Sequence, residues 1–287
     1  MTFKFTGFAD EASVQLDQQI EVLHHVGWTA LELRLVDGTN VCDLTDHEWN
    51  KTLGLMHDYN IDIVGFGGQI ANWARPINEP YQRDVDELKR NVPRMKEAGT
   101  RLIRVMSYPN AAENPMPKDE WKAEVVKRLG ELCKIAEDND VILGHENCNG
   151  YGGVGGEEFL ELVDALDSPA FKLIFDTGNN SLHDHDLEAT WRYYELCRNH
   201  IVHVHIKAAK PGPNGKMTTC YPDEDPIQER VLADLSRRRY DGWLSIEPHM
   251  AAAIHEGRDA SGEEARQLWG EYARRIEILA DRVSTAD

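Results

Sequence analysis

The sequence has few basic residues for its length, which limits the partners it can bind. Its 287 residues include 31 Lys and Arg against 50 Asp and Glu, so the formal net charge is −19. A chain this acidic repels a phosphate backbone unless a local basic patch overrides the repulsion. The densest basic run, Arg237–Arg239, comes late in a predicted helix and is typical of a solvated helix end. We therefore expect no nucleic-acid partner.

Cysteine is also scarce, and its spacing excludes the common cysteine-built sites. The five cysteines form no CxxC pair and no zinc-binding pattern. An odd number of scattered thiols favours a reduced, cytoplasmic protein over a disulfide scaffold. The first residues, MTFKFTGFADEA, do not combine a basic segment with an apolar run, so we expect no secretory signal. We also expect no membrane contact, because no stretch approaches the roughly 18 apolar residues of a membrane helix.

The strongest pattern in the sequence is a repeated unit, in which a short β-branched or apolar run precedes a longer amphipathic segment. Continuous apolar runs are typical of strands that are buried on both faces. The predicted strands are Lys4–Ala9, Thr29–Arg34, Asp62–Gly67, Arg101–Ser107, Val141–Glu146, Lys172–Asp176, Ile201–Ile206 and Gly242–Glu247. Between them, segments such as Glu120–Asp138 and Glu264–Val283 carry apolar residues every three to four positions and are predicted helices.

Eight such units favour a (β/α)8 TIM barrel, which typically takes about 250 residues. An open doubly wound sheet is the alternative, but it usually has a glycine-rich phosphate loop after its first strand, and GFADEAS at 7–13 is not one. The glycine-rich GYGGVGG at 150–156 lacks the Lys-Ser/Thr of a P-loop and is interpreted as a βα loop. No linker-like tract divides the chain, so we expect one TIM-barrel domain over residues 1–287.

Polar side chains gather at the predicted carboxyl ends of the strands, where the βα loops of a barrel build its site. They are Glu32, Arg34, Ser107, His145, Glu146, Asn147, Asp176, Asn179, His203, His205, Lys207, Glu247 and His249. Burying so many charged groups at one barrel mouth is costly unless they are compensated. A divalent cation would compensate the acids among them.

Four of these residues form a set suited to such a cation. Glu146, Asp176, His205 and Glu247 follow four successive strands and supply three carboxylates and one imidazole. This set favours Mn²⁺, Mg²⁺ or a similar ion over structural zinc, which prefers thiolates. His203 and His205 are two apart in a strand and point to the same face, so that one can bind the metal while the other supports it.

Four motifs resemble those of a known enzyme family. They are ENCNGYGG at 146–153, FDTGN at 175–179, HVHIK at 203–207 and YDGWLSIEP at 240–248. Through them the chain resembles the xylose-isomerase-like TIM-barrel superfamily, which includes sugar phosphate isomerases and epimerases and the family 2 AP endonucleases. The resemblance runs through nearly the whole chain. The endonuclease branch binds three metals with many more histidines and grips DNA, so the resemblance implies the sugar branch.

The resemblance implies one divalent metal, most often Mn²⁺, with Mg²⁺, Co²⁺ or Zn²⁺ as alternatives. Its ligands correspond to Glu146, Asp176, His205 and Glu247. In the ketose epimerases the two metal-bound glutamates also move protons on the two faces of the substrate, so both are expected to be catalytic. Lys207 matches the family's lysine after H-V-H-I and is expected to stabilise developing negative charge. Further polar residues at the strand ends are expected to bind substrate: Glu32, Arg34, Ser107, Asn179 and His203.

Three residues depart from the epimerase pattern. Asn179 stands where several epimerases carry a substrate-contacting histidine, and Ala208 follows Lys207 where many relatives carry Asp. His145 precedes the metal glutamate where many relatives carry an apolar residue. It is a further candidate for the catalytic base if the strand has ended or bulged there, because adjacent strand residues otherwise point to opposite faces.

The expected reaction is removal of a proton next to the carbonyl of a keto sugar, through an enediolate. The alternative is a lyase: a related dehydratase, or the catalytic α subunit of a C-glycoside deglycosidase, which cleaves 3-keto-C-glycosides with a smaller β subunit. A non-catalytic sugar-binding or scaffold barrel is the third hypothesis. The expected partners are a small keto sugar or keto-glycoside and either further copies of the chain, in a homo-oligomer, or that β subunit.

Overall fold

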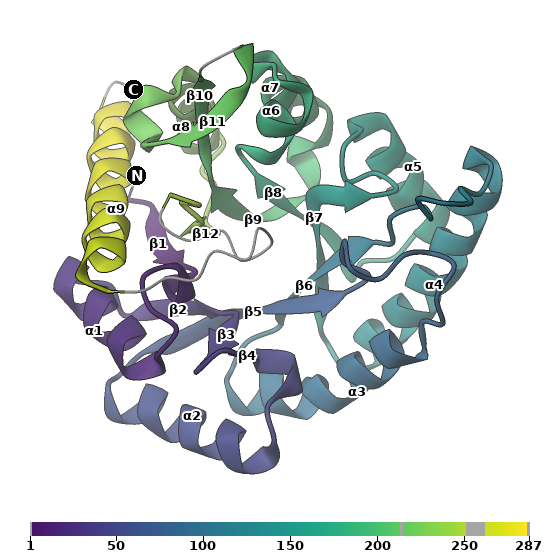
Figure 1. The fold of residues 1–287 in the computed structure, drawn as a ribbon, viewed down its shortest axis with the longest axis horizontal. Coiled ribbons are helices and arrows are strands. Elements are labelled where there is room, and N and C mark those ends of the chain that lie inside the picture. The colour runs from purple at the N-terminus through teal and green to yellow at the C-terminus, as the bar shows by residue number, and fades with distance from the viewer. Residues whose placement is uncertain (1, 213–214, 251–261, 286–287) are drawn as a thin grey trace.

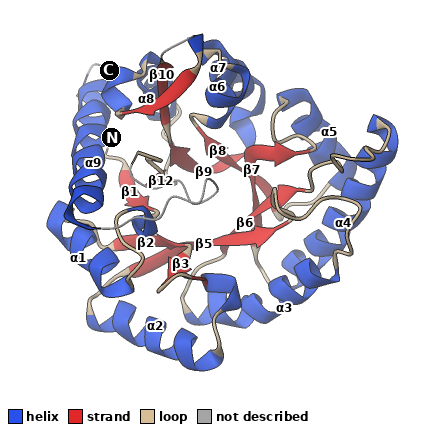
Figure 2. Ribbon diagram, in the orientation of Figure 1, coloured by secondary structure: helices blue, strands red, loops and turns tan. Residues whose placement is uncertain are grey.

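The computed structural model describes residues 2–212, 215–250 and 262–285, in which eight parallel strands form a ring with helices outside it (Figures 1 and 2). All eight predicted strands are confirmed, and the predicted (β/α)8 barrel is correct. The strands are β1 (Lys4–Gly7), β2 (Ala30–Leu33), β5 (Asp62–Ile70), β6 (Leu102–Ser107), β7 (Ile142–Gly150), β8 (Phe171–Asp176), β9 (Ile201–Ile206) and β12 (Trp243–Ile246). Of these, β5 and β7 run past their predicted ends by three and four residues and carry the chain into the site.

The strands lie in the order β1-β12-β9-β8-β7-β6-β5-β2, which returns β2 to the side of β1. The barrel is nearly closed: the ring of strands is continuous except between β1 and β2, which no backbone ladder joins in the described part of the chain. A side chain crosses this seam instead: the hydroxyl of Thr6 donates a hydrogen bond to the carbonyl oxygen of Ala30, at 3.0 Å.

The outer layer consists of helices that follow the strands. They are α1 (Leu16–Val26), α2 (Asp46–Asp58), α3 (Gln82–Glu97), α4 (Lys118–Asp138), α5 (Gly156–Leu166), α6 (Asn179–Asp184), α7 (Leu187–Cys197), α8 (Pro226–Arg237) and α9 (Gly262–Thr285). Among the described residues, none of these helices combines the length and the apolar character that crossing a bilayer requires. Two short hairpins, β3–β4 (Leu35–Val36 and Thr39–Asn40) and β10–β11 (Ala208–Pro211 and Met217–Cys220), extend the loops after β2 and β9.

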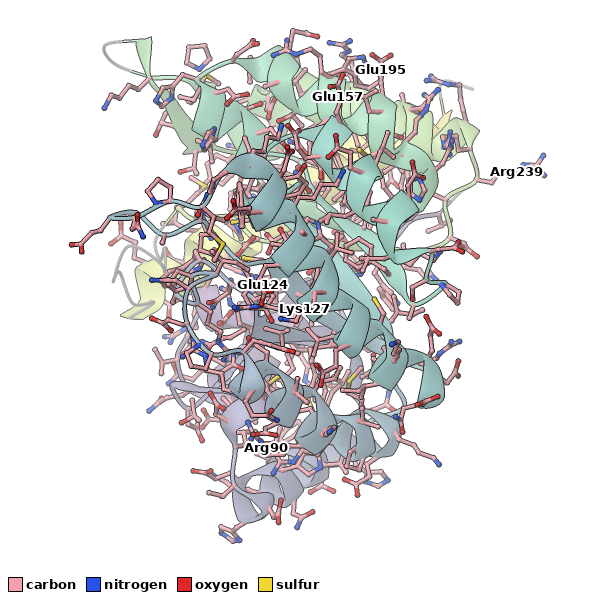
Figure 3. All side chains as sticks on the ribbon, turned by 90° about the vertical axis from the view of Figure 1, so that its right-hand side faces the viewer. Arg90, Glu124, Lys127, Glu157, Glu195 and Arg239 are labelled. Carbon is pink, nitrogen blue, oxygen red and sulfur yellow. The ribbon has the colours of Figure 1, made fainter. Side chains whose placement is uncertain are left out.

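The outer surface of the helices is charged. Figure 3 shows Glu124 and Lys127 on α4, whose side chains pair at 3.0 Å, and Arg239, which projects from the molecule beyond the end of α8. Arg239 is exposed, as the prediction of a solvated helix end requires. The apolar faces of the helices cover the sheet; Phe159 of α5, for example, stacks on Phe171 of β8 with ring centroids 5.9 Å apart.

Alternation along each strand divides the side chains between this helix layer and the barrel interior. In β7, Glu146 and Cys148 line the internal cavity, whereas His145 packs against Phe159 of the outer layer. After β7 the chain turns at Gly150, where φ is +90° and a Cβ atom would lie 2.6 Å from the backbone of Ser107. The GYGGVGG segment is therefore a βα loop, as predicted, and it leads into α5.

Candidate metal centre

Four side chains converge at the carboxyl ends of four adjacent strands. Glu146 comes from β7, Asp176 ends β8, His205 lies in β9 and Glu247 follows β12. Each offers one ligand atom, and these atoms all lie within 4.8 Å of one another in a fully buried group. The register of the strands helps to bring these side chains together, because Asp176 and His205 are paired neighbours between β8 and β9. The structure thus brings together the four residues that the sequence singled out as metal ligands.

Two carboxylate oxygens of the cluster accept no hydrogen bond from the described residues: Asp176 Oδ2 and Glu247 Oε2. Both face the ammonium group of Lys207, at 3.0 and 2.9 Å. Lys207 is itself buried and donates a hydrogen bond to the side-chain oxygen of Asn179. Buried oxygens of this kind are normally hydrogen-bonded. Two such oxygens that share one ammonium group as ion pairs, without a hydrogen bond, keep lone pairs that fit a cation bound within the cluster.

The surroundings of the cluster favour an ionised Glu146 and a positive charge at the imidazole, whereas they oppose ionisation of Asp176. Burial raises the pKa of Glu146, but Arg104 and His205 outweigh it and lower that pKa to about 2. Burial lowers the pKa of His205, but Glu32 and Glu146 outweigh it and raise that pKa to about 10. The pKa of Asp176 rises to about 6, because burial exceeds the opposing effect of Lys207. The cluster therefore favours an added positive charge, which either a proton on His205 or a bound cation supplies.

The composition of the cluster fits a divalent ion of hard to borderline character. Three carboxylates and one imidazole are ligands that Mn²⁺ and Mg²⁺ accept, and the set contains no thiolate. Cys148 lies nearby on the cavity wall, but burial raises the pKa of its thiol well above the ordinary value, which keeps the thiol neutral. A neutral thiol is a poor metal ligand.

The two glutamates of the cluster are each held by an arginine. Arg34 places Nη1 at 2.6 Å from Glu247 Oε1, and Arg104 places Nη1 at 3.2 Å from Glu146 Oε2. Phe8 lies beneath both guanidinium groups, with its ring centroid 4.0 Å from Arg34 and 5.4 Å from Arg104. Arg34 also pairs with two buried acids that follow β1, Asp10 and Glu11. Buried ion pairs thus hold both Glu146 and Glu247 in place.

A cavity of about 320 Å³ opens above the cluster and is lined by Glu146, Lys207 and Glu247 at its charged end. Side-chain amides make up much of its wall: Asn40, Gln69, Asn72, Asn149 and Asn179. Its apolar wall comprises Leu35, Met106 and Trp73, and the indole of Trp73 is 47% exposed. Amides that donate and accept hydrogen bonds beside an exposed aromatic ring suit a hydroxyl-rich ligand.

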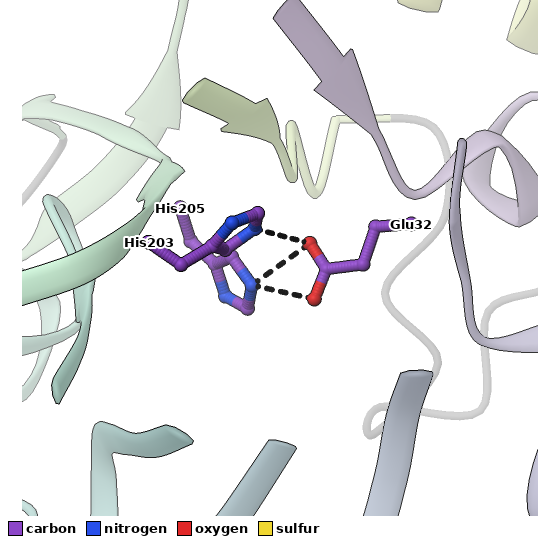
Figure 4. A group of neighbouring side chains, drawn as sticks. All are labelled: Glu32, His203 and His205. Atoms are coloured by element: carbon purple, nitrogen blue, oxygen red, sulfur yellow. Dashed lines mark hydrogen bonds and ion pairs between the residues drawn. The ribbon is translucent and has the colours of Figure 1, made fainter. Parts of the chain in front are cut away.

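Of the residues expected to bind substrate, two line this cavity. Arg34 and Asn179 lie on its wall, beside Glu146 and Glu247. Glu32 and His203 lie elsewhere: both are 1% exposed, and they contact each other beneath His205, with Glu32 Oε2 2.8 Å from His203 Nε2 (Figure 4). Neither lines the cavity, so the expectation that they contact substrate does not match their positions.

Ser107 and His145 lie on the opposite face of the sheet from the cluster. His145 is fully buried between the rings of Phe159 and Phe171, with centroids at 5.4 and 5.5 Å, and its Nε2 lies 2.9 Å from the Ser107 hydroxyl. Burial lowers the pKa of His145 to about 4, so the ring is neutral. The pairing of β7 with β8 is regular through His145 and Glu146, and the register shift of β7 against β6 comes only after His145, so ordinary alternation turns His145 towards the helices. It is therefore separated from the place where a substrate would bind.

The structure adds residues that the sequence analysis did not assign to the site. Arg104 lies inside β6 and was masked by the apolar run around it, although it shares a strand face with Met106. His249 follows β12 with φ at +50° and places Nε2 3.2 Å from Glu247 Oε1 and 3.3 Å from Glu11 Oε1. The sequence signal that could have identified His249 was its spacing of two from Glu247, which puts both on the same face of the chain.

An eight-stranded parallel β/α barrel with a carboxylate-rich cluster at the carboxyl ends of its strands defines a recognisable class of proteins. Comparison with protein families matches residues 20–282 to the xylose isomerase-like TIM barrel family. This match covers most of the chain, and the chain belongs to that family. The resemblance seen in the sequence motifs is confirmed.

Among curated proteins, the inosose dehydratase of Clostridium tetani (strain Massachusetts / E88) is 27% identical to this chain over 177 residues. The matched region covers 56% of this chain and 58% of the length of that dehydratase. The similarity thus spans little more than half of the relative, and it includes neither protein in full.

Two solved structures share the fold over nearly the whole chain. A xylose isomerase-like TIM barrel protein from Mycobacterium smegmatis, in complex with magnesium, superposes with a TM-score of 0.73 at 12% identity and covers 99% of this chain and 98% of its own. The D-allulose 3-epimerase from Methylomonas sp., in complex with D-allulose, gives a TM-score of 0.69 at 17% identity and coverages of 98% and 97%. At these identities the likeness shows the common barrel.

Proposed function

We propose that this protein is a divalent-metal-dependent enzyme that removes a proton next to the carbonyl of a keto sugar, as an isomerase or epimerase. The observation that carries the proposal is the buried four-residue cluster at the floor of an amide-lined cavity. The family supports it, because the D-allulose 3-epimerase shares this barrel. Mn²⁺ is the ion that best suits the three carboxylates and one imidazole, and Mg²⁺ is the alternative.

Glu146 and Glu247 are the proposed proton-transfer residues. They project from β7 and β12, which are separated by β8 and β9 in the sheet, so they flank the cavity floor from different sides. Each is paired with an arginine that keeps its carboxylate ionised and fixes its orientation. When bound, the divalent cation supplies the polarisation of the substrate carbonyl that makes the neighbouring C–H acidic.

Lys207 and Asn179 are the proposed groups for charge stabilisation and substrate orientation. The Lys207 ammonium lies within 3.0 Å of Asp176 and of the Asn179 side-chain oxygen and lines the cavity. A buried cation placed there stabilises negative charge that develops on a substrate oxygen. The amide of Asn179 reaches Glu146 Oε1 at 3.3 Å and so links that carboxylate to Lys207.

The charge balance of the cavity favours an uncharged substrate. Each Lys or Arg on its described wall is already paired with a carboxylate: Arg34, Arg104 and Lys207. A phosphate or carboxylate on the substrate would have to compete with these carboxylates for the same cations, and it would lie close to Glu146 and Glu247. A neutral polyhydroxylated ketone instead matches the amide wall.

A lyase that eliminates water or an aglycone is the second candidate. The specific support is the 27% identity to an inosose dehydratase, together with Asn179 at a position where several epimerases carry histidine. Proton removal next to a carbonyl is common to both reactions, and the fate of the resulting enediolate differs. The residues proposed for proton removal would therefore be the same in an isomerase, an epimerase or a lyase.

Deuterium incorporation from D₂O into a panel of keto sugars and 3-keto-glycosides tests the proposal. We expect Mn²⁺-dependent exchange with a rearranged sugar, followed by NMR and mass spectrometry. Release of water or of an aglycone would move the assignment to the lyase. Glu146→Gln should abolish exchange, whereas Glu157→Gln, which removes an exposed acid from α5, should leave it unchanged. Metal binding without exchange in any substrate would contradict the enzymatic proposal and favour a binding barrel.

A further inference from the structure

We propose that Glu32 is the positioning residue of the metal centre: its carboxylate holds the His205 ring so that Nδ1, and not Nε2, faces the ion. This inference rests on the proposed function, because it requires a metal at the cluster. It replaces the expected contact between Glu32 and substrate with a role beneath the site.

The argument begins with the two ring nitrogens of His205, which face different partners. Nε2 lies 3.2 Å from both carboxylate oxygens of Glu32. On the opposite side of the ring, Nδ1 lies 3.4 Å from Glu146 Oε1 and 3.8 Å from Glu247 Oε2. Since Nε2 is directed at Glu32, Nδ1 is the nitrogen that stands among the other candidate ligands. Figure 4 shows both histidine rings turned towards the Glu32 carboxylate.

Glu32 can set the orientation of His205 because the carboxylate is itself fixed. It accepts a hydrogen bond from the Ser245 hydroxyl at 2.5 Å and contacts His203 Nε2 at 2.8 Å. These partners come from β12 and β9, so Glu32 on β2 is held from across the barrel interior. Its side chain is 1% exposed, which leaves it no access to a ligand in the cavity.

The His205 ring has little freedom to turn away from this arrangement. Phe8 packs against it edge to face, with centroids 5.0 Å apart and an interplanar angle of 69°. Rotating the imidazole by half a turn would put the carbon Cδ2 where Nδ1 now faces the cluster, and the carbon Cε1 beside the buried carboxylate of Glu32. Losing a polar contact to a buried carboxylate is costly. Carboxylates that accept the second N–H of a metal-bound histidine are a general means of fixing its orientation.

The same three residues, Glu32, His203 and His205, are close enough to hold an ion of their own. The inference assigns them to hydrogen bonding and therefore predicts one Mn²⁺ per chain. A stoichiometry of two in isothermal titration calorimetry, with one ion lost in Glu32→Gln and the other retained, would overturn it.

Nitrogen-15 NMR of the wild-type protein loaded with diamagnetic Zn²⁺ tests the ring orientation directly. We expect the signal of His205, assigned by its absence from His205→Gln, to show a proton on Nε2 and a metal-shifted Nδ1. A proton on Nδ1 would overturn the inference. The ring orientation is measured in the wild-type protein, and His205→Gln serves only to assign the signal.

Metal affinity of Glu32→Gln is the second test. We expect Mn²⁺ affinity to fall by about 10- to 100-fold, measured by calorimetry. The matched control is Thr6→Val, which removes another buried hydrogen bond of the barrel seam away from the cluster and should leave the affinity unchanged. Far-UV circular dichroism and urea unfolding of both metal-free variants report the fold.

The outcomes separate the two proposals. If the wild type binds no divalent metal, the proposed function fails together with this inference. If the wild type binds Mn²⁺ and Glu32→Gln binds it equally well, the inference alone fails. If Glu32→Gln and Thr6→Val weaken binding equally, Glu32 acts only through barrel stability, which also overturns its positioning role.

Discussion

His145 Nε2 lies 2.9 Å from the Ser107 hydroxyl, and this contact joins β7 to β6 on the helix side of the sheet. Directly beside it in the chain, Glu146 points to the other side and lines the cavity. Two adjacent residues of one strand therefore have separate environments, one apolar and one ionic. The contact between His145 and Ser107 supports the fold from outside the site.

We expect His145→Leu to lower the free energy of unfolding by about 1–3 kcal/mol, because the hydroxyl of Ser107 loses its contact at 2.9 Å and is left with the longer hydrogen bond to the Asn149 carbonyl oxygen, at 3.4 Å. Deuterium exchange per folded molecule should stay within about threefold, since transition-state contacts are unchanged. Urea unfolding and the exchange assay measure the two effects. A loss of exchange beyond about 100-fold in a folded variant would instead identify His145 as a catalytic base.

Asp176→Asn should remove most of the stabilisation that Mn²⁺ gives to the fold. At a free metal concentration of 100 times its Kd, a single site adds about 2.7 kcal/mol, and thermal melts with and without EDTA report it. The control is Glu195→Gln, which removes an acid from the exposed surface of α7 (Figure 3). Equal metal-dependent shifts in both variants would place the ion outside the cluster.

A ketose should be a better substrate than the same ketose carrying a terminal phosphate. Arg34, Arg104 and Lys207 of the described cavity wall are each paired with a carboxylate, so the phosphate has to compete with these acids for the same cations. We expect kcat/KM to be at least about tenfold lower for the phosphate, which corresponds to about 1.4 kcal/mol. A preference for the phosphorylated sugar would contradict the charge balance proposed for the cavity.

Trp73→Ala should weaken substrate binding by about tenfold, because the exposed indole offers an apolar face at the cavity wall. The effect should appear in KM more than in kcat, since Trp73 lies on the cavity wall and outside the cluster of ionisable groups. Tyr59→Ala is the matched control, because Tyr59 is another exposed aromatic residue, at the end of α2 and outside the cavity. An equal effect of both substitutions would remove Trp73 from the binding surface.

The strands and the four candidate ligands could be predicted from the sequence because both depend on local patterns. Apolar runs interrupted by amphipathic segments specify the alternation of strands and helices. The parallel barrel then brings the residues at the strand ends to one face, which is why Asp176 and His205 meet although 28 residues separate them in the chain.

The face of the sheet that a residue occupies can also be predicted from the sequence, by strict alternation along each strand. In β6, Arg104 and Met106 both line the cavity, and counting by two from them places Ser107 on the outer face. The same counting from Glu146 places His145 outside. Alternation therefore corrects the assignment of Ser107 to substrate binding and identifies Arg104 as part of the site.

Depth within the barrel could not be predicted in this way. Glu32, in β2, and Arg34, directly after β2, lie on the same face of the chain, yet only Arg34 reaches the cavity. Strands of a closed barrel are tilted and staggered, so residues two apart lie in different layers. The layer that holds Glu32 and His203 is fixed by the relative shift of β2, β9 and β12, and a single sequence does not specify that shift.

The two halves of the barrel contribute different parts of the candidate site. The four candidate ligands come from β7, β8, β9 and β12, which are consecutive in the sheet, whereas Glu32, Arg34 and Arg104 come from strands earlier in the chain. Much of the cavity's amide and apolar wall, including Asn40, Gln69 and Trp73, also belongs to that earlier half. Substitutions of wall residues such as Asn40, Gln69 and Trp73 would therefore change the ligands accepted without altering the four candidate metal ligands, which gives evolution or an engineer a module to vary.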